Sequence, residues 1–175
     1  LGITLRRMCH ELLENYGDFS DTVLIATQPR GVYLGRRINS LLQDILGEQA
    51  PPYGELDTTF FRDDFRHRDG RPLEPNKTQV DFLIEDRRVI LIDDVLFTGR
   101  TVRAAMDAML AFGRPKSVEL MVLVDRKHSR EVPVEASYAG IIVGTVPTER
   151  VIVDLKEKSG GEDEVYIADS LRSST

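Results

Sequence analysis

Two adjacent carboxylates, Asp93 and Asp94, lie at the centre of the stretch VILIDDVLFTGRT, residues 89–101. Four apolar residues that favour β-strands precede them, and a short loop with two threonines and one glycine follows. Ionised carboxylates side by side repel each other, and burying one without a partner costs several kcal/mol. They therefore need cations, hydroxyl donors or backbone amides, and the stretch predicts carboxylates that bind hydroxyl groups.

The loop after the carboxylates, residues 97–101, combines hydroxyl groups with the expected start of a helix near Val102. Backbone N–H groups at a helix start lack partners within the helix and readily bind an anion. The sequence has neither the lysine of a P-loop nor the GxGxxG of a dinucleotide site. Carboxylates and loop together fit a ribose phosphate. A simpler interpretation is that the carboxylates cap a turn and that Thr98 or Thr101 caps the helix.

Apolar residues recur at helical and at strand spacing in turn along the chain. Buried strands that alternate with amphipathic helices predict an α/β fold with a mainly parallel, twisted sheet flanked by helices. Helices are expected at residues 5–16, 34–45 and 102–112. Gly47 and Gly113 end the last two. The inner stripe of the helix at 34–45 consists of Leu34, Ile38, Leu41, Leu42 and Ile45. Strands are expected at residues 22–26, 56–61, 80–83, 89–92, 118–124, 137–143, 151–155 and 164–167, the last two as a hairpin.

Three of the predicted strands end in polar residues. In open parallel sheets, ligands bind beyond the carboxyl ends of the strands. We therefore expect these residues to line one edge of the molecule. The strand at 22–26 leads into Thr27, Gln28, Pro29, Arg30 and Gly31, the strand at 89–92 into Asp93 and Asp94, and the strand at 118–124 into Asp125, Arg126, Lys127 and His128.

The chain has 175 residues, 41% of them hydrophobic and 30% charged, a length that suits one core better than two. We expect one domain over residues 1–169 and a disordered tail at 170–175. A net charge of −6 does not favour general nucleic-acid binding, so any basic face must be local. With one cysteine, Cys9, no internal disulfide can form, and no apolar run approaches the roughly 20 residues of a membrane span. A cytoplasmic protein without membrane contact is expected, because the first helix does not read as a secretory signal.

The stretch VILIDDVLFTGRT resembles the PRPP-binding signature of type I phosphoribosyltransferases. With GELDTTFFRDD and VDRKHSREVPV, the chain closely resembles one subfamily, the pyrimidine-operon regulators that are also uracil phosphoribosyltransferases, from about residue 7 to residue 167. The resemblance implies a type I fold with a small hood region and a flexible β-hairpin lid at about residues 56–83, around the charged loop 62–77. The implied reaction converts uracil and PRPP to UMP and diphosphate.

The resemblance also implies a role for each residue of the PRPP site. Asp93 and Asp94 hold the ribose 2′ and 3′ hydroxyls, and Mg²⁺ binds near them with PRPP rather than in an all-protein site. Arg30 and Arg62 stabilise charge on the leaving diphosphate. The lid excludes water when it closes. Thr98, Gly99, Arg100 and Thr101 hold the 5′-phosphate; Thr27, Gly31, Val95, Leu96 and Phe97 also contact the nucleotide; Arg66 reaches the diphosphate on closure, and Asp63 and Asp64 order the lid.

One loop departs from the family pattern. Where the family more usually has a Lys-Thr pair, this chain has Gln28 and Pro29, so one cation is missing. Our hypothesis is a cis or strained peptide before Pro29 that directs backbone N–H groups at phosphate, since proline reaches the cis form at low cost.

Base and RNA contacts are implied as well. An aromatic residue at Phe97 favours stacking on a pyrimidine, and backbone groups of Arg126, Lys127 and His128 would read uracil. No general base is identified. In the family, a basic face of a dimer or tetramer binds pyrimidine-operon (pyr) leader mRNA under the control of UMP or UTP, which causes transcription attenuation. The residues expected on that face are Arg6, Arg7, His10, His128 and Arg130.

Three functions remain open at this point. The chain is a bifunctional enzyme and RNA regulator, a plain pyrimidine-salvage enzyme, or a nucleotide-sensing RNA regulator with little catalysis. Short basic groups are often ordinary solvated surface, which would leave the second alternative, but the family resemblance favours the first.

Overall fold

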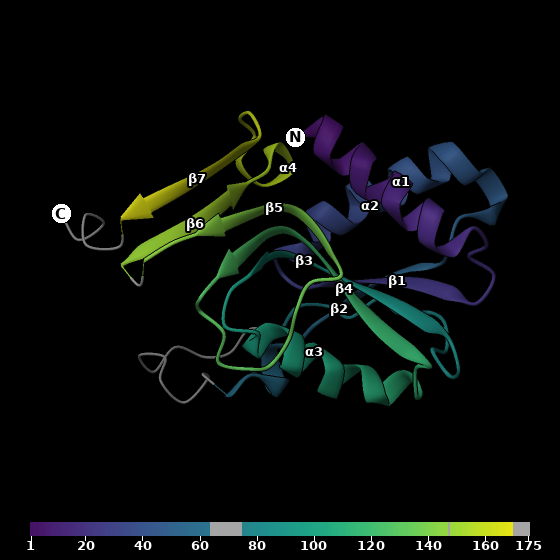
Figure 1. The fold of residues 1–175 in the computed structure, drawn as a ribbon. Helices are drawn as coiled ribbons and strands as arrows, with labels where there is room; N and C mark the ends of the chain where they lie inside the picture. The colour runs from purple at the N-terminus through teal and green to yellow at the C-terminus, as the bar shows by residue number, and fades with distance from the viewer. Residues whose placement is uncertain (64–74, 147, 170–175) are drawn as a thin grey trace.

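A five-stranded parallel sheet forms the centre of the computed structural model, which describes residues 1–63, 75–146 and 148–169 (Figure 1). The strand order is β2-β1-β3-β4-β5, and every neighbouring pair is parallel. The predicted α/β fold with a mainly parallel sheet is therefore confirmed. The strands are β1 (Thr22–Thr27), β2 (Tyr53–Leu56), β3 (Arg88–Leu96), β4 (Ser117–Lys127) and β5 (Tyr138–Gly144).

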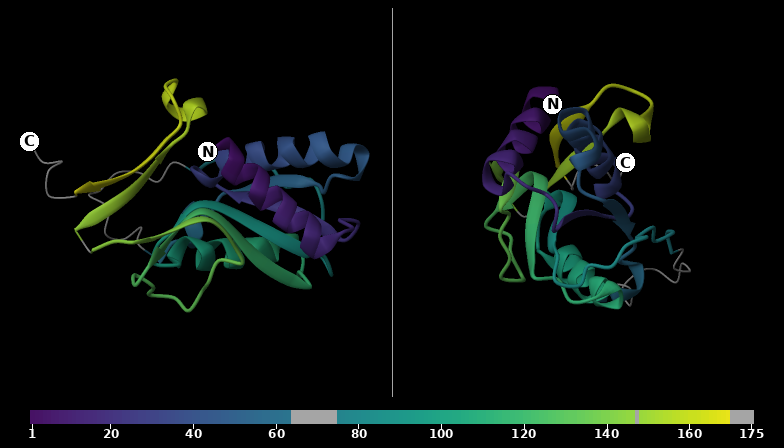
Figure 2. Two further views of the ribbon diagram at one scale, coloured as in Figure 1. Left: turned by 45° about the horizontal axis from the view of Figure 1, so that its top comes forward. Right: turned by 90° about the vertical axis from the view of Figure 1, so that its right-hand side faces the viewer.

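Helices cover both faces of this sheet (Figure 2). On one face, α1 (Gly2–Tyr16) and α2 (Gly31–Leu46) pack on Leu24 and Ile90. On the other face, α3 (Arg100–Met109) packs on Val23 and Leu91. Because consecutive residues of the inner strands point into opposite cores, these strands need apolar residues at every position, and their sequences are continuous apolar runs.

A small antiparallel unit, the hood (residues 149–169), lies toward the carboxyl ends of the strands (Figure 1). It consists of β6 (Glu149–Asp154), α4 (Lys156–Ser159) and β7 (Glu164–Asp169). Arg37 of α2 ties it to the core, since its guanidinium donates to Glu157 Oε1 at 2.8 Å and to Asp163 Oδ2 at 2.7 Å. The predicted hairpin of the last two strands is thus confirmed.

The predicted strand at 56–61 is wrong. The edge strand β2 ends at Leu56, and a 3₁₀ turn occupies Thr59–Phe61. The Asp57 carboxylate accepts hydrogen bonds from the Thr59 amide at 3.1 Å and the Thr59 hydroxyl at 2.6 Å. Such a local side-chain bond competes with strand pairing and turns the chain.

The predicted return strand at 80–83 is also wrong. Within the described part of the segment, pairing with β2 is limited to one antiparallel bridge between Glu55 and Gln79. The Asp57 carboxylate closes the base of the loop by accepting from the Asn76 amide at 3.1 Å. The expectations for Asp64, Arg66 and the tail at 170–175 lie outside the described residues.

Two further expectations concern local geometry. The Gln28-Pro29 peptide is cis, as hypothesised. The prediction that Ile45 lies on the inner stripe of α2 is wrong, because its side chain is 44% exposed. Ile38 of the same helix is fully buried. None of the helices in the described ranges is long and apolar enough to cross a membrane.

The two isoleucines of α2 provide a test of this packing. Ile38→Ala should lower the free energy of unfolding by about 2–5 kcal/mol, because it leaves a cavity in a closed core. Ile45→Ala should change it by less than about 0.5 kcal/mol, because the side chain is largely in solvent. Urea unfolding followed by circular dichroism measures both. Equal losses in the two variants would contradict the orientation of α2.

Candidate active site

The two carboxylates lie inside β3 rather than after it, because β3 continues to Leu96. Asp93 is 6% and Asp94 9% exposed. Asp93 Oδ1 accepts from the Thr27 hydroxyl at 2.7 Å and from the Asp94 amide at 3.0 Å. Asp94 Oδ1 accepts from the Val95 amide at 2.8 Å. The carboxylates thus obtain the hydroxyl and amide donors that the sequence analysis required.

Burial dominates the electrostatics of this pair. Loss of hydration raises the pKa of Asp93, and the neighbouring Asp94 charge raises it further. Burial also raises the pKa of Asp94, while the Asp94–Val95 backbone contact and the charge of Arg30 oppose that rise. Each carboxylate would be stabilised by a ligand that donates hydroxyl hydrogens or brings positive charge.

Gly31, the first residue of α2, allows the helix to approach the carboxylates. A Cβ atom at Gly31 would lie 2.5 Å from Thr27 Oγ1 and 2.7 Å from the Ile92 carbonyl oxygen. Any side chain would therefore separate α2 from β3. Arg30 immediately precedes this helix and is exposed at its N-cap, beside the same strand end.

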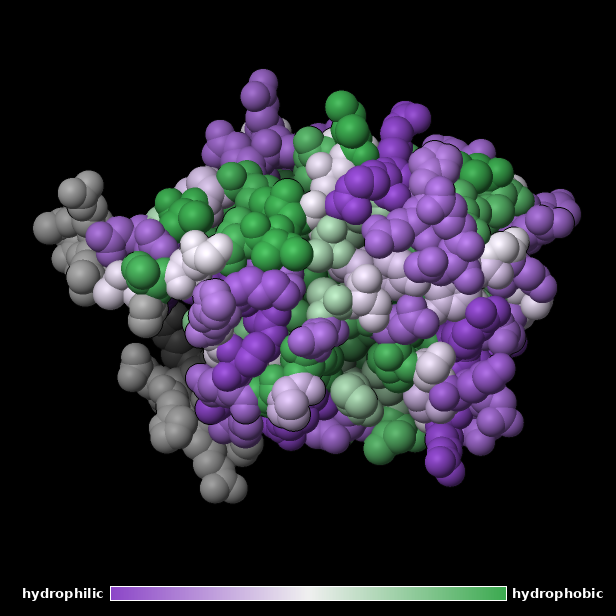
Figure 3. All heavy atoms as spheres, in the orientation of Figure 1, coloured by the Kyte–Doolittle hydropathy of each residue, from purple (hydrophilic) through white to green (hydrophobic). Residues whose placement is uncertain are grey.

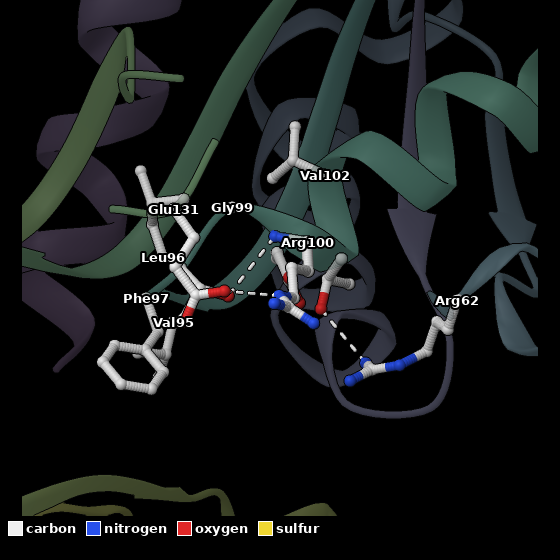
Figure 4. A pocket seen from close by; sticks show the side chains of 11 residues that line it. Arg62, Val95, Leu96, Phe97, Gly99, Arg100, Val102 and Glu131 are labelled. Carbon is white, nitrogen blue, oxygen red and sulfur yellow. Dashed lines mark hydrogen bonds and ion pairs between the residues drawn. The ribbon is translucent and has the colours of Figure 1, made fainter. Parts of the chain in front are cut away.

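A short loop, residues 97–99, connects β3 to α3. Gly99 has φ +88°, a left-handed conformation that favours glycine, and a Cβ atom there would lie 2.6 Å from Val134 Cγ1. The loop borders a cleft of about 430 Å³ (Figure 4). The cleft is lined by Arg62, Asp93, Val95, Leu96, Phe97, Thr98, Gly99, Arg100, Thr101, Val102 and Glu131.

Two arginines reach this cleft from different segments (Figure 4). Arg62 donates to the Thr101 hydroxyl at 3.2 Å. Arg100 donates to Glu131 Oε2 at 2.5 Å and lies 3.5 Å from Asp63 Oδ1. Two arginines and the acids Asp93 and Glu131 thus line the cleft, and the amide groups at the start of α3 beside them suit an anion.

At the end of β4, Arg126 stacks on Phe97. The Arg126 guanidinium carbon lies 3.8 Å from the ring centroid. Burial lowers the pKa of Arg126, whose side chain donates to Thr145 Oγ1 at 2.9 Å and to the Glu149 carbonyl at 3.0 Å. Phe97 remains 40% exposed, so a planar group could stack on the ring.

The other two residues of the expected base site have different surroundings. The Lys127 ammonium lies 2.9 Å from Asp125 Oδ2. His128 is exposed and has φ +65°. The structure thus brings Phe97 and Arg126 together, while Lys127 faces a buried acid.

Arg130 lies behind the loop rather than on an open surface, since its side chain is 22% exposed. Its guanidinium pairs with Asp125 and donates to the carbonyls of Phe97 at 2.5 Å and Arg126 at 2.8 Å. These bonds occupy donors that an RNA contact would need, and that contact stays a prediction.

The remaining residues of the expected RNA face form a separate group on α1. Arg6 and His10 are exposed, and Arg7 donates at 2.8 Å to the carbonyls of Ala139 and Gly140, at the start of β5. Lys127, next to His128, pairs with Gly144 at the other end of β5. Four residue steps of β5, a rise of about 13 Å, therefore separate Gly140 from Gly144.

Apolar surface occupies part of the space between these groups. Ile141 and Ile142 of β5 are 41% and 61% exposed. Figure 3 shows apolar side chains gathered over β5 and β6. The common RNA face of these basic residues stays a prediction.

Sequence reasoning missed a buried acid beside the loop at Gln28. Glu55 of β2 is 4% exposed and accepts from Arg36 Nε at 2.7 Å and from Gln28 Nε2 at 3.0 Å. Its backbone also forms the bridge to Gln79. Glu55 therefore connects the loop after β1 with the base of the charged segment. The one signal in the sequence that could have indicated this network is Gln28, which stands where the family usually has a lysine.

Comparison with known proteins identifies the family of this fold. Residues 1–157 match the family model described as phosphoribosyl transferase domain. The fold resembles a hypoxanthine phosphoribosyltransferase of Trypanosoma cruzi (TM-score 0.66, 16% identity, 95% of this chain and 85% of that chain) and one of Staphylococcus aureus (TM-score 0.59, 18% identity, 87% and 78%). The chain is therefore a member of the phosphoribosyltransferases.

Closer relatives narrow the assignment. The chain is 44% identical to the bifunctional protein PyrR of Desulfosudis oleivorans over 95% of this chain and 91% of that protein. It is 42% identical to the Enterococcus faecalis protein of the same name (90% and 86%) and 41% identical to that of Listeria welshimeri (93% and 89%). It belongs to the PyrR family.

The pKa shift at Asp93 predicts a stability change that depends on pH. A raised pKa means that the unfolded chain ionises first, so this residue destabilises the unliganded fold increasingly as the pH rises above the usual aspartate range. Asp93→Asn, which keeps an oxygen for Thr27, should be more stable than wild type by about 1 kcal/mol or more at pH 8 and should lose this advantage toward pH 4.

Urea unfolding at several pH values measures the difference. Asp107→Asn is the matched control, because Asp107 is half exposed on α3 and pairs with Arg103. A gain in Asp93→Asn that stays constant from pH 4 to pH 8 would refute the proposed burial cost.

Proposed function

We propose that this protein transfers the phosphoribosyl group of PRPP to uracil, giving UMP and diphosphate. The observation that carries the proposal is the buried carboxylate pair at the carboxyl end of β3, followed directly by the glycine loop and the start of α3. Ribose hydroxyls donate well to carboxylates, and a 5′-phosphate suits the amide groups of the loop. Membership of the PyrR family supports uracil as the base.

In this mechanism, Asp93 and Asp94 accept hydrogen bonds from the 2′ and 3′ hydroxyls and orient the sugar. Their negative charge also favours the positive charge that develops on the ribose ring as the C1′–oxygen bond breaks. The loop from Thr98 to Thr101 fixes the 5′-phosphate, so the sugar is held at both ends. Such positioning reduces the entropy cost of reaching the transition state.

The leaving diphosphate requires positive charge on the opposite side of the sugar. We assign this charge to Arg30, whose positive charge opposes the rise in the pKa of Asp94, and to Arg62, which lines the cleft beside Thr101 and would turn toward the diphosphate. Uracil would stack on Phe97 and meet backbone groups of residues 126–128. The cis peptide before Pro29 belongs to the loop that would contact diphosphate.

Mg²⁺ fits this site as a partner of PRPP. Among the described residues, no group of three or more His, Cys, Asp or Glu side chains could hold a metal ion. Mg²⁺ commonly binds through one or two carboxylates, waters and substrate phosphates, and Asp93 and Asp94 offer two such carboxylates. When bound, it would neutralise charge on the diphosphate.

An assay of UMP formation from labelled uracil and PRPP with Mg²⁺ tests the enzyme. Asp94→Asn should lower kcat/KM for PRPP about 10- to 100-fold, since it removes a charged hydrogen-bond acceptor. The matched variant Asp107→Asn changes an exposed carboxylate on α3 and should retain the wild-type rate. If Asp94→Asn kept full activity, the role assigned to the pair would be wrong.

We propose further that the protein acts in the cytoplasm as a homodimer or homotetramer that binds pyr leader mRNA more tightly with UMP. The exposed positions of Arg6 and His10, four residues apart on α1, support an RNA contact on that helix. Because Arg7 is tied to β5, we assign it to holding α1 in place beside that contact.

Titration of labelled leader RNA at several salt concentrations, with and without UMP, tests regulation. Arg6→Ala should weaken binding and reduce the magnitude of the salt slope by about 1, as expected for loss of a phosphate contact. Arg114→Ala, an exposed arginine just before β4, is the control and should leave the slope unchanged.

The two assays also separate the alternative functions. Turnover without RNA binding would identify a plain salvage enzyme. RNA binding without turnover would identify a nucleotide-sensing regulator.

A further inference from the structure

Arg130 connects three segments that meet at the cleft. Its Nη1 atom donates to the carbonyls of Leu96 at 3.3 Å, Phe97 at 2.5 Å and Arg126 at 2.8 Å. Its Nε atom donates to the Val134 carbonyl at 3.1 Å, and its charge is paired with buried Asp125. One guanidinium therefore binds the end of β3, the start of the loop and the segment after β4.

The next residues along the chain continue this contact. The amides of Glu131 and Val132 both donate to the Thr98 carbonyl, at 2.9 and 3.0 Å. The carbonyls of Phe97 and Thr98, which are consecutive, are thus both held by residues 130–132. The Gly99 position, which has no room for a Cβ atom beside Val132 and Val134, shows how closely the two segments pack.

Holding consecutive carbonyls on one side determines where the amides point. In a planar trans peptide, the C=O and N–H groups point in opposite directions. Carbonyls of Phe97 and Thr98 that face residues 130–132 therefore direct the N–H groups of Thr98 and Gly99 away from them. Successive amides that point the same way form a concave anion site.

We infer that Arg130 is a positioning residue that orients the amides of the loop toward the 5′-phosphate. The inference rests on the proposed function and assigns Arg130 to the nucleotide site rather than to RNA. Arginine suits this task because its planar group presents several donors at once, whereas lysine offers one compact ammonium.

The test compares Arg130→Lys with Arg88→Lys. Arg130→Lys keeps a positive charge beside Asp125 and so avoids leaving a buried acid with fewer cations, but it cannot reach all four carbonyls. Arg88, at the opposite end of β3, is a matched control: its side chain is 28% exposed, pairs with Asp21 and donates to the Asp18 carbonyl at 3.3 Å. Both variants lose an arginine that joins β3 to another segment of the chain.

Arg130→Lys should raise the KM for PRPP and the Kd for UMP, measured by calorimetry, by about tenfold or more, because misplaced donors weaken phosphate binding. Arg88→Lys should leave both values as in wild type. A merely structural role for Arg130 would reduce the folded fraction, and hence the apparent kcat, without changing KM or Kd. That result would overturn the inference.

RNA titration without nucleotide tests the alternative, in which Arg130 contacts RNA directly. If Arg130 contacts RNA directly, Arg130→Lys weakens RNA binding and leaves the Kd for UMP unchanged, which also overturns the inference. Absence of UMP formation by the wild-type protein would instead refute the proposed function. The UMP measurement needs no turnover, so the two failures are distinguishable.

Discussion

The structure depends on the burial of two adjacent carboxylates at the end of its central strand. Asp93 and Asp94 cannot be satisfied by β3 alone, because the strand offers their side chains only the amides of Asp94 and Val95. The fold brings the Thr27 hydroxyl, two local amides and the field of Arg30 to them. These contacts offset part of the cost, and the raised pKa of each carboxylate indicates that a cost remains. Ligand hydroxyls would reduce this cost of burial. The residues that lower the stability of the unliganded fold are therefore the ones that we propose bind the ribose.

Close approach of backbone segments makes this arrangement feasible. Gly31 lets α2 begin against Thr27 and Ile92, and Gly99 lets the loop pack against Val132 and Val134. Both glycines lie where a parallel strand passes into a helix, at the same edge of the sheet. The site is therefore built by three strand ends whose order is β1, β3, β4, and its geometry follows from their parallel register.

The central part of this architecture was predictable, because apolar runs report burial on both faces and parallel strands share one edge. The edge of the sheet at β2 was harder to predict from the sequence. Strand β2 contains Gly54 and Glu55, and its end is set by Asp57, whose partners lie at Thr59 and Asn76. Ile45 fits a helical stripe yet lies beyond the reach of the sheet. Glu55 contacts Gln28 and Arg36, Arg130 contacts Leu96 and Phe97, and Glu131 contacts Arg100, all distant in the chain, and no local pattern of residues encodes such contacts.

Arg130 illustrates why residue type alone assigns roles poorly. In the sequence it stands beside His128 and Lys127 and reads as part of a basic surface. In the fold, Asp125 is buried, and its carboxylate requires cations from the same turn, which Lys127 and Arg130 supply. The guanidinium, drawn inward, also donates to the carbonyls of Leu96 and Arg126, near the ends of β3 and β4. The segment after β4 thereby holds the loop of residues 97–99 on one side and carries the exposed His128 on the other. Because the hydrogen bonds of residues 130–132 join the loop after β3 to the segment that carries His128, a displacement of one segment would act on the other.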